Sequence, residues 1–141
     1  MKFKVIRSKF MEGLKSVQNI VAGKGSLQIL QNVLLEARGH ELKMTTTDLD
    51  ISILNVCESQ VIEAGSSTLP VKLLFNAIAK VAEGEIEIEI DAKERATISA
   101  GNARYKIAGM PESEFPRLPK DEDPYVYTIS QHVFGEMLRK V

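Results

Sequence analysis

The sequence has no tryptophan, and its shortages of cysteine (one residue) and histidine (two residues) each remove a class of function. A single cysteine cannot form an intrachain disulfide, which favours a reducing compartment, so we predict a cytoplasmic protein. His40 and His132 have no cysteine or second histidine nearby, so we predict no metal site and no cofactor. No apolar run approaches the roughly 20 residues that span a bilayer, which argues against a membrane protein.

What is present is an ordinary globular composition with an uneven distribution of charge. The 141 residues are 44% hydrophobic and 26% charged, which suits one domain with a sizeable core. The formal net charge is only −1. However, residues 1–82 carry ten Lys and Arg against seven Asp and Glu, whereas residues 83–123 carry six against eleven. This segregation keeps nucleic acid open as a partner.

The first half of the chain reads as a strand, a helix and three strands. KFKVI is typical of a strand, and Ser8 suits the N-cap of a helix over residues 8–24 that Gly23 and Gly25 would end. The apolar residues of this helix share one face: Phe10, Leu14, Val17 and Val21. The three strand-like runs that follow are NVLLEA, ELKMTT and DISILNVCE.

The second half repeats this order. SSTLP is short and extended, Pro70 suits the first turn of a helix, and EIEIEID alternates as a half-buried strand does. The helical stripe comprises Leu73, Leu74, Ala77, Ile78 and Val81. RATISA and ARYKIAG supply two more strands. We therefore predict two βαβββ units, at about residues 1–64 and 65–110, with two helices packed on a largely antiparallel sheet in an α+β domain.

The run MPESEFPRLPKDEDP predicts a proline-rich connector, because four prolines exclude a regular helix or a central strand. Phe115 is a lone aromatic residue that would pin the connector to the domain. Beyond it, YVYTI and QHVFGEMLRKV repeat the strand and helix of the N-terminus. We expect one domain over residues 1–119, and over residues 120–141 a linker with the truncated first strand and helix of a second domain. The chain would then be a fragment of a longer protein.

Asp48 and Asp50, in the run MTTTDLDISI, are the first candidates for chemistry. A catalytic pair would need a pocket that raises the pKa of one carboxyl group, and nothing nearby implies such a pocket. The run also lacks the ligand spacing of a calcium loop. We predict that its Thr and Asp side chains cap backbone groups of a turn between two strands, and that the chain has no catalytic residues.

The two predicted helices are better candidates for a binding site, because nearly all their charges have one sign. Their lysines are Lys9, Lys15, Lys24, Lys72 and Lys80, and Glu12 is their only acid. By contrast, residues 83–96 carry six acids against two cations. Basic helices and acidic outer strands would present one positive face, which attracts phosphates without reading base sequence.

Five segments in order resemble the bacterial sliding clamp, the β subunit of DNA polymerase III. They are MKFKV, the glycine-bounded loop leading to LQILQNVLLEA, TTTDLDISI, TLPVKLLFNAI and MPESEFPRLP. The resemblance covers residues 1–119, and YVYTISQHVFGEMLRKV looks like the start of the family's second domain. It implies the DNA-clamp (processivity) fold, in which three such domains per chain and two chains close a head-to-tail homodimer ring around duplex DNA.

The resemblance implies a non-enzymatic replication processivity factor that slides on duplex DNA and tethers the replicative polymerase. The implied DNA-binding residues are Lys24 and Lys72, with Lys9, Lys15 and Lys80 as further candidates from their helix positions. Arg95 and Arg104 match basic positions of the family's dimer interface. The polymerase and the clamp loader would bind domains that lie outside these 141 residues.

Leu73 and Asn102 stand where members of the family can carry cations, so the implied ion-pair network at the interface is thinner here. Two alternatives unrelated to DNA stay open. One is a carboxylate-dependent enzyme that uses Asp48 and Asp50. The other is a protein-interaction module whose acidic strands bind a partner.

Overall fold

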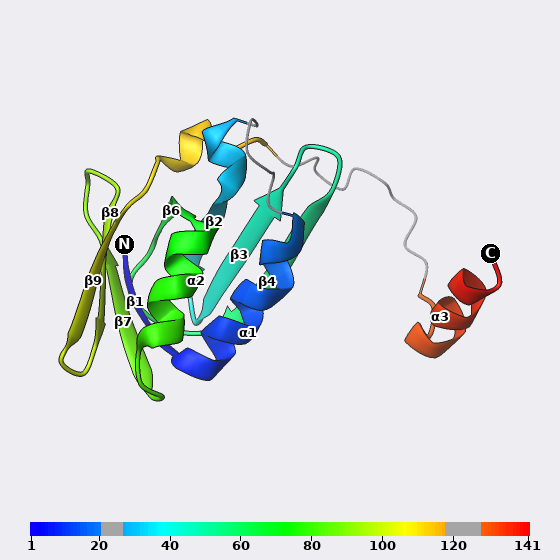
Figure 1. The fold of residues 1–141 in the computed structure, drawn as a ribbon, viewed down its shortest axis with the longest axis horizontal. Coiled ribbons are helices and arrows are strands. Elements are labelled where there is room, and N and C mark those ends of the chain that lie inside the picture. Colours follow the sequence, from blue (N-terminus) through cyan, green and yellow to red (C-terminus); the bar gives the residue numbers. More distant parts are fainter. Residues whose placement is uncertain (21–26, 118–127) are drawn as a thin grey trace.

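The computed structural model describes residues 1–20, 27–117 and 128–141, and its elements follow the predicted repeat (Figure 1). The first unit contains β1 (Lys2–Ile6), α1 (Arg7–Val17), β2 (Asn32–Arg38), β3 (Glu41–Thr47) and β4 (Ser52–Glu58). The second unit contains β6 (Gly65–Pro70), α2 (Val71–Lys80), β7 (Glu85–Ile90), β8 (Arg95–Ala100) and β9 (Ala103–Ala108). Between the units lies β5 (Gln60–Glu63), a short strand that the sequence does not predict.

The strands form two antiparallel sheets, because each unit gives its first strand to the other. The five-stranded sheet has the order β5-β1-β7-β8-β9, and the four-stranded sheet has the order β4-β3-β2-β6. Lys4 of β1 lies opposite Glu87 of β7, and Thr68 of β6 lies opposite Leu34 of β2. The α+β class and the antiparallel pairing are confirmed. The structure corrects the expectation of one sheet. There are two sheets among the described residues, and each contains the first strand of the other unit.

The helices lie on the same side of the strands, with α1 over β3 and β4 and α2 against β6 and β9 (Figure 1). The predicted stripes are buried, since Phe10, Leu14, Leu74 and Ile78 are all 0% exposed. Leu73 is the exception at 56% exposure. It lies next to the buried line in sequence but about 100° away around the helix, so its side chain points to solvent.

The helix ends differ from the expected ones. α1 begins at Arg7, and Ser8 makes no side-chain cap. The α-helix ends at Val17, where the Thr46 hydroxyl donates to the Val17 carbonyl at 2.6 Å and satisfies a carbonyl of the last turn. A single 3₁₀ turn, η1 (Gln18–Ile20), follows. The expected stop at Gly23 and Gly25, and Val21 of the apolar face, lie outside the described residues.

The predicted start of the second helix is one residue too early. Pro70 is the last residue of β6, and α2 begins at Val71. Pro70 has a φ of −57°, which the proline ring favours and which leads directly into a helix.

The first part of the proline-rich connector packs on the four-stranded sheet. Met110 forms a bridge with Thr68, and a short 3₁₀ turn, η3 (Glu112–Glu114), follows. Phe115 is 6% exposed in a small cluster with Leu34 and with residues of η2 (Gln28–Gln31). Phe115 therefore pins the connector, as predicted.

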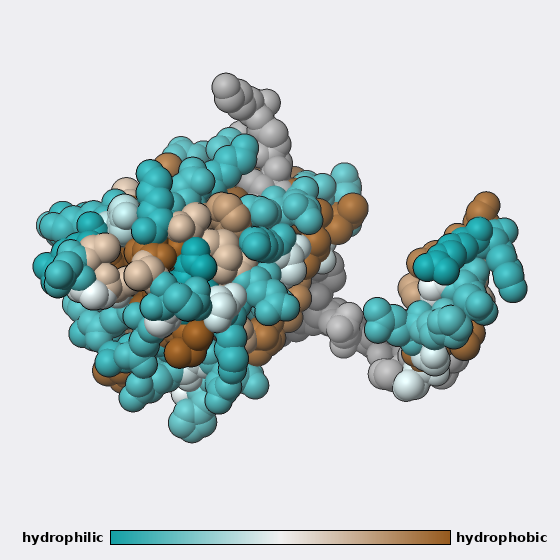
Figure 2. Space-filling model, turned by 60° about the horizontal axis from the view of Figure 1, so that its bottom comes forward, coloured by the Kyte–Doolittle hydropathy of each residue, from teal (hydrophilic) through white to brown (hydrophobic). Residues whose placement is uncertain are grey.

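The predicted C-terminal helix is present as α3 (Gln131–Arg139). Residues 125–127 of the strand expected before it lie outside the described residues, and residues 128–130 have no regular structure. Figure 2 shows apolar side chains on the surface of α3; its large exposed ones are Val133, Phe134, Met137 and Leu138. None of the helices in the described ranges is long and apolar enough to cross a membrane. The division at residue 119 stays a prediction.

Candidate nucleic-acid interface

The Asp48 carboxylate holds the turn between β3 and β4. Its Oδ1 accepts the N–H groups of Asp50 at 3.0 Å and Ile51 at 2.7 Å. The Thr47 hydroxyl accepts the N–H of Leu49, which has a φ of 85°, and donates to the Ile51 carbonyl. The prediction that these side chains cap a turn is confirmed, and this geometry gives no support to a carboxylate-dependent enzyme.

The other chemically notable side chains are not brought together. Within residues 1–20, 27–117 and 128–141, no group of three or more His, Cys, Asp or Glu could hold a metal ion. His40 is exposed in the turn between β2 and β3. Cys57 is half-buried, and this burial raises the pKa of its thiol to about 11. The thiol is therefore protonated and unreactive at neutral pH.

The helix layer, which we define as α1 and α2, carries lysines on its solvent side. Lys9, Lys15, Lys72 and Lys80 are all exposed, because the core occupies the opposite faces of both helices. Lys15, Lys72 and Lys80 form no ion pair with any residue in the described part of the chain. Lys24 lies outside the described residues, so its placement on this surface stays a prediction.

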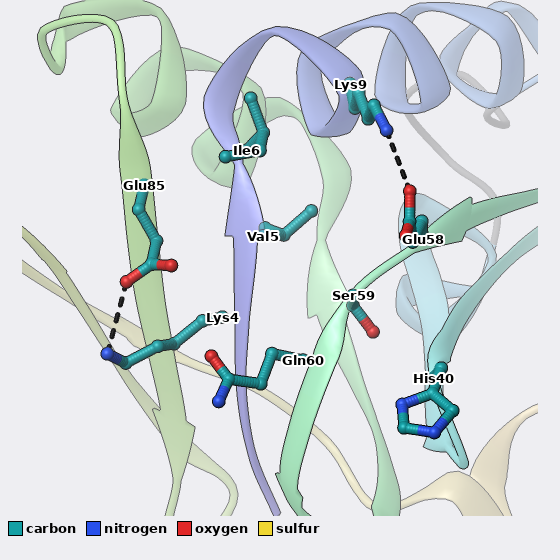
Figure 3. Close-up of a pocket in the computed structure, with 9 residues that line it drawn as sticks. All are labelled: Lys4, Val5, Ile6, Lys9, His40, Glu58, Ser59, Gln60 and Glu85. Atoms are coloured by element: carbon teal, nitrogen blue, oxygen red, sulfur yellow. Dashed lines mark hydrogen bonds and ion pairs between the residues drawn. The ribbon is translucent and has the colours of Figure 1, made fainter.

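Lys9 differs from the other helix-layer lysines because an acid from the sheet holds it. Its Nζ lies 2.9 Å from Oε2 of Glu58, the last residue of β4 (Figure 3). The hydrogen bond between the two side chains raises the pKa of Lys9 and lowers the pKa of Glu58. Lys9 is therefore less available for a contact with phosphate than Lys15, Lys72 and Lys80.

The outer face of the five-stranded sheet is not simply acidic. Lys2 Nζ lies 3.0 Å from Glu87 and 3.2 Å from Glu89, and Lys4 Nζ lies 3.1 Å from Glu85 (Figure 3 shows the Lys4 pair). The exchange of β1 into this sheet places two lysines of the first unit against three acids of the second. Summing charge along the sequence misses this neutralisation.

Arg95 and Arg104, the predicted interface residues, lie on β8 and β9, the two strands nearest one edge of the five-stranded sheet. The Arg95 side chain donates to the Asp91 carboxylate at 3.0 Å. Arg104 is exposed on β9, the edge strand, and has no ion pair among the described residues. The sequence interpretation omits Lys106, which alternation places on the same face as Arg104 and which borders a shallow cavity with Arg95. The strict period of two in ARYKIAG is the signal that predicts this third cation.

The fold is that of a sliding-clamp domain. The DNA polymerase sliding clamp of Bacillus subtilis superposes with a TM-score of 0.92 at 22% identity, over 99% of this chain and 39% of that one. The DNA polymerase sliding clamp of Caulobacter crescentus gives a TM-score of 0.82 at 29% identity, over 86% of this chain and 34% of that one.

The family follows from the sequence match. The family described as DNA polymerase III beta subunit, N-terminal domain, matches residues 1–119, and the chain belongs to this family. The Beta sliding clamp of Chlamydia muridarum is 31% identical over 140 residues, which are 99% of this chain. The chain spans 38% of the length of that relative. The resemblance seen in the sequence is thus confirmed.

Proposed function

We propose that this chain is a fragment that carries the first domain of a DNA-replication processivity clamp. The whole protein would be a head-to-tail homodimeric ring in the cytoplasm that encircles duplex DNA, slides on it and tethers the replicative polymerase. No residue of this chain would be catalytic. The polymerase and the clamp loader would bind domains outside these 141 residues.

The exposed lysines of the helix layer are the observation that carries this proposal. Lys15, Lys72 and Lys80 have no ion-pair partner in the described ranges, and α2 has no acid of its own. Lysine is a flexible point charge that attracts phosphates without reading bases. Such contacts give affinity without fixing a position on the duplex, as a sliding ring requires. Lys24 is added to these lysines only because the resemblance to the clamp family implies it.

The free sheet edges support assembly with further domains. β4 and β9 are the last strands of their units, and each is an edge of its sheet. An edge strand has unpaired backbone groups that can accept another strand. Docking at both edges would continue the sheets and leave the helix layer on one side of the assembly. Arg95, Arg104 and Lys106 would supply the cations for ion pairs at the β9 edge.

Binding of a labelled duplex over a salt series tests the assignment of the helix layer. In a Lys15→Gln, Lys72→Gln, Lys80→Gln variant, the slope of log affinity against log salt should become shallower by up to about 0.9 per lost phosphate contact. Lys43→Gln is the matched control, because Lys43 lies on β3 and pairs with Glu36 at 3.4 Å. An unchanged slope in the triple variant would show that these lysines do not contact DNA.

A further inference from the structure

Arg7 and Glu83 connect the two helices at the end where they approach each other (Figure 1). Arg7 is the first residue of α1, and Glu83 follows the end of α2 by three residues. Arg7 Nη1 lies 3.0 Å from Glu83 Oε2. The Arg7 backbone N–H also donates to the Gly84 carbonyl at 2.8 Å. The start of one helix is thus joined to the segment that leaves the other.

Each of these side chains also caps the opposite helix. The Glu83 carboxylate accepts the N–H of Ser8 at 3.1 Å, a free amide in the first turn of α1. The Arg7 guanidinium donates to the carbonyls of Ile78 and Ala79 in the last turn of α2, both at 3.3 Å. The acid therefore lies at the positive end of α1 and the base at the negative end of α2, which favours both contacts.

Neither helix replaces these contacts with a cap of its own. Ile6 is the N-cap residue of α1 and offers no side-chain acceptor, and Val81 is the C-cap residue of α2. Gly84 has a φ of 137°, a backbone conformation that L side chains rarely adopt, and it turns the chain into β7 directly after Glu83. The local backbone is therefore shaped so that Glu83 faces α1.

Two of the lysines proposed to contact DNA, Lys15 and Lys72, lie far from this junction, whereas Lys80 is the last residue of α2 and lies near it. Lys15 is eight residues beyond Arg7, which is about 12 Å along α1. Lys72 lies in the first turn of α2, at the end opposite Glu83. In the view of Figure 1 the helices diverge from the junction. A change of angle at the junction therefore moves Lys15 and Lys72 by more than it moves the junction itself.

We propose that Arg7 and Glu83 form a helix latch that sets the angle between α1 and α2, and with it the spacing of the phosphate-contacting lysines. Arg7 is then a positioning residue and not itself a DNA contact, because its donors are directed to Glu83 and the end of α2. The part of this inference that concerns DNA rests on the proposed function. The part that concerns the helix angle does not.

Spin labels on the two helices test the angle directly. Ser16 on α1 and Asn76 on α2 are exposed and can be changed to cysteine in a Cys57→Ala background. The label-to-label distance distribution should broaden or shift in Arg7→Gln and in Glu83→Ala, and the double variant should match the single ones because the latch is one unit. Lys4→Gln is the control: it breaks an ion pair on the outer face and should keep the parent distribution.

Glu83→Ala also separates positioning from simple charge in duplex binding. Removing an acid makes the chain more positive, so charge alone predicts tighter binding at low salt. The latch predicts binding that is weaker by severalfold, because the lysines lose their spacing. Parent distances in a folded Glu83→Ala variant, or tighter duplex binding, would overturn the proposal. If the parent does not bind duplex, the part of the inference that concerns DNA fails, and the distance measurement still decides whether the latch exists.

Discussion

The helix layer and the outer face of the five-stranded sheet both carry lysines. The sheet lysines form ion pairs, whereas most of the described helix-layer lysines do not. On the sheet, Lys2 and Lys4 each lie within 3.2 Å of a glutamate of β7. In the helix layer, Lys15, Lys72 and Lys80 have no such neighbour among the described residues. A lysine that is already paired offers little to a phosphate. The difference shows that a charged surface is defined by its neighbours in space, and not by its net charge in sequence.

Strand exchange is the cause of this difference. β1 brings its lysines beside the acids of β7 because the first strand of one unit pairs within the sheet of the other. Among the described residues, the helix lysines have no equivalent acidic neighbour, except where the end of β4 places Glu58 beside Lys9. Lys9 thus belongs electrostatically with the paired sheet lysines, although it lies on a helix.

The largest expected effect on the free energy of unfolding distinguishes the buried face of α1 from its exposed face. Leu14 is 0% exposed against the core, and Lys15 is its exposed neighbour. Leu14→Ala should lower the free energy of unfolding by about 2–5 kcal/mol, because it leaves a cavity that the core fills only in part. Lys15→Ala should change it by less than about 0.5 kcal/mol. Urea denaturation measures both, and similar losses in the two variants would contradict the described orientation of α1.

Removing the ion-pair partner of Lys9 should make this lysine as available to phosphate as Lys15, Lys72 and Lys80. Glu58→Gln removes the acid that holds Lys9, so one more lysine becomes available in the helix layer. The salt slope of duplex binding should steepen by up to about 0.9, the contribution of one phosphate contact.

Two further variants control the release of Lys9. Adding Lys9→Gln to the Glu58→Gln variant should restore the parent slope. Glu114→Gln removes an exposed acid from η3 and should leave the slope unchanged. If Glu114→Gln steepens the slope equally, net charge and not the release of Lys9 is responsible.

The local elements follow from the sequence because their causes are local. The period of two in EIEIEID and the helical spacing of Phe10, Leu14 and Val17 each place apolar atoms on one face, and the core buries those faces. The exchange of first strands has no such local cause. Lys2 pairs with Glu89, 87 residues away, and only the assembled sheets select that partner. β5 is equally hard to predict from the sequence, since its four residues form a strand only by pairing with β1.

The sequence identifies the candidate site residues, but it does not tell which of them are free to contact phosphate. Counting charge along the predicted helices finds Lys9, Lys15, Lys72 and Lys80 without distinguishing among them. The contact that sets Lys9 apart joins residues 49 positions apart. The same holds for Arg7, whose donors reach α2 across 71 and 72 positions. Long-range contacts decide which charges are free, and one sequence alone does not contain them.

A double-mutant cycle should show how little the paired sheet lysines add to stability. Lys4 and Glu85 are partly exposed, so their coupling in the free energy of unfolding should be about 0.2–1 kcal/mol and should shrink in salt. The cycle compares Lys4→Gln, Glu85→Gln and the double variant with the parent. A cycle on Lys72 and Glu85, which form no ion pair, should give coupling near zero. Equal coupling in both cycles would mean that the Lys4 contact is not specific.

The smallest expected effect lies at the far end of the same sheet, where Asp91 pairs with Arg95. Hydrogen bonds to its carboxylate, first from the Arg95 backbone N–H and then from Lys93 N–H and the Arg95 side chain, lower the pKa of Asp91 from its ordinary value of 3.8. Because the folded pKa is the lower one, the stabilisation is complete above the unfolded pKa. It is lost as the pH falls through the folded pKa.

The loss of stability below about pH 4 should therefore be shallower in Asp91→Asn than in the parent, because the variant has no carboxylate to protonate at this position. Unfolding in urea at several pH values from neutral to acid measures this slope. Asp50→Asn removes the same charge from the turn between β3 and β4 and serves as the control. An Asp91→Asn slope equal to that of the parent would mean that protonation of Asp91 does not change the stability of the fold, which would contradict a lowered pKa in the folded state.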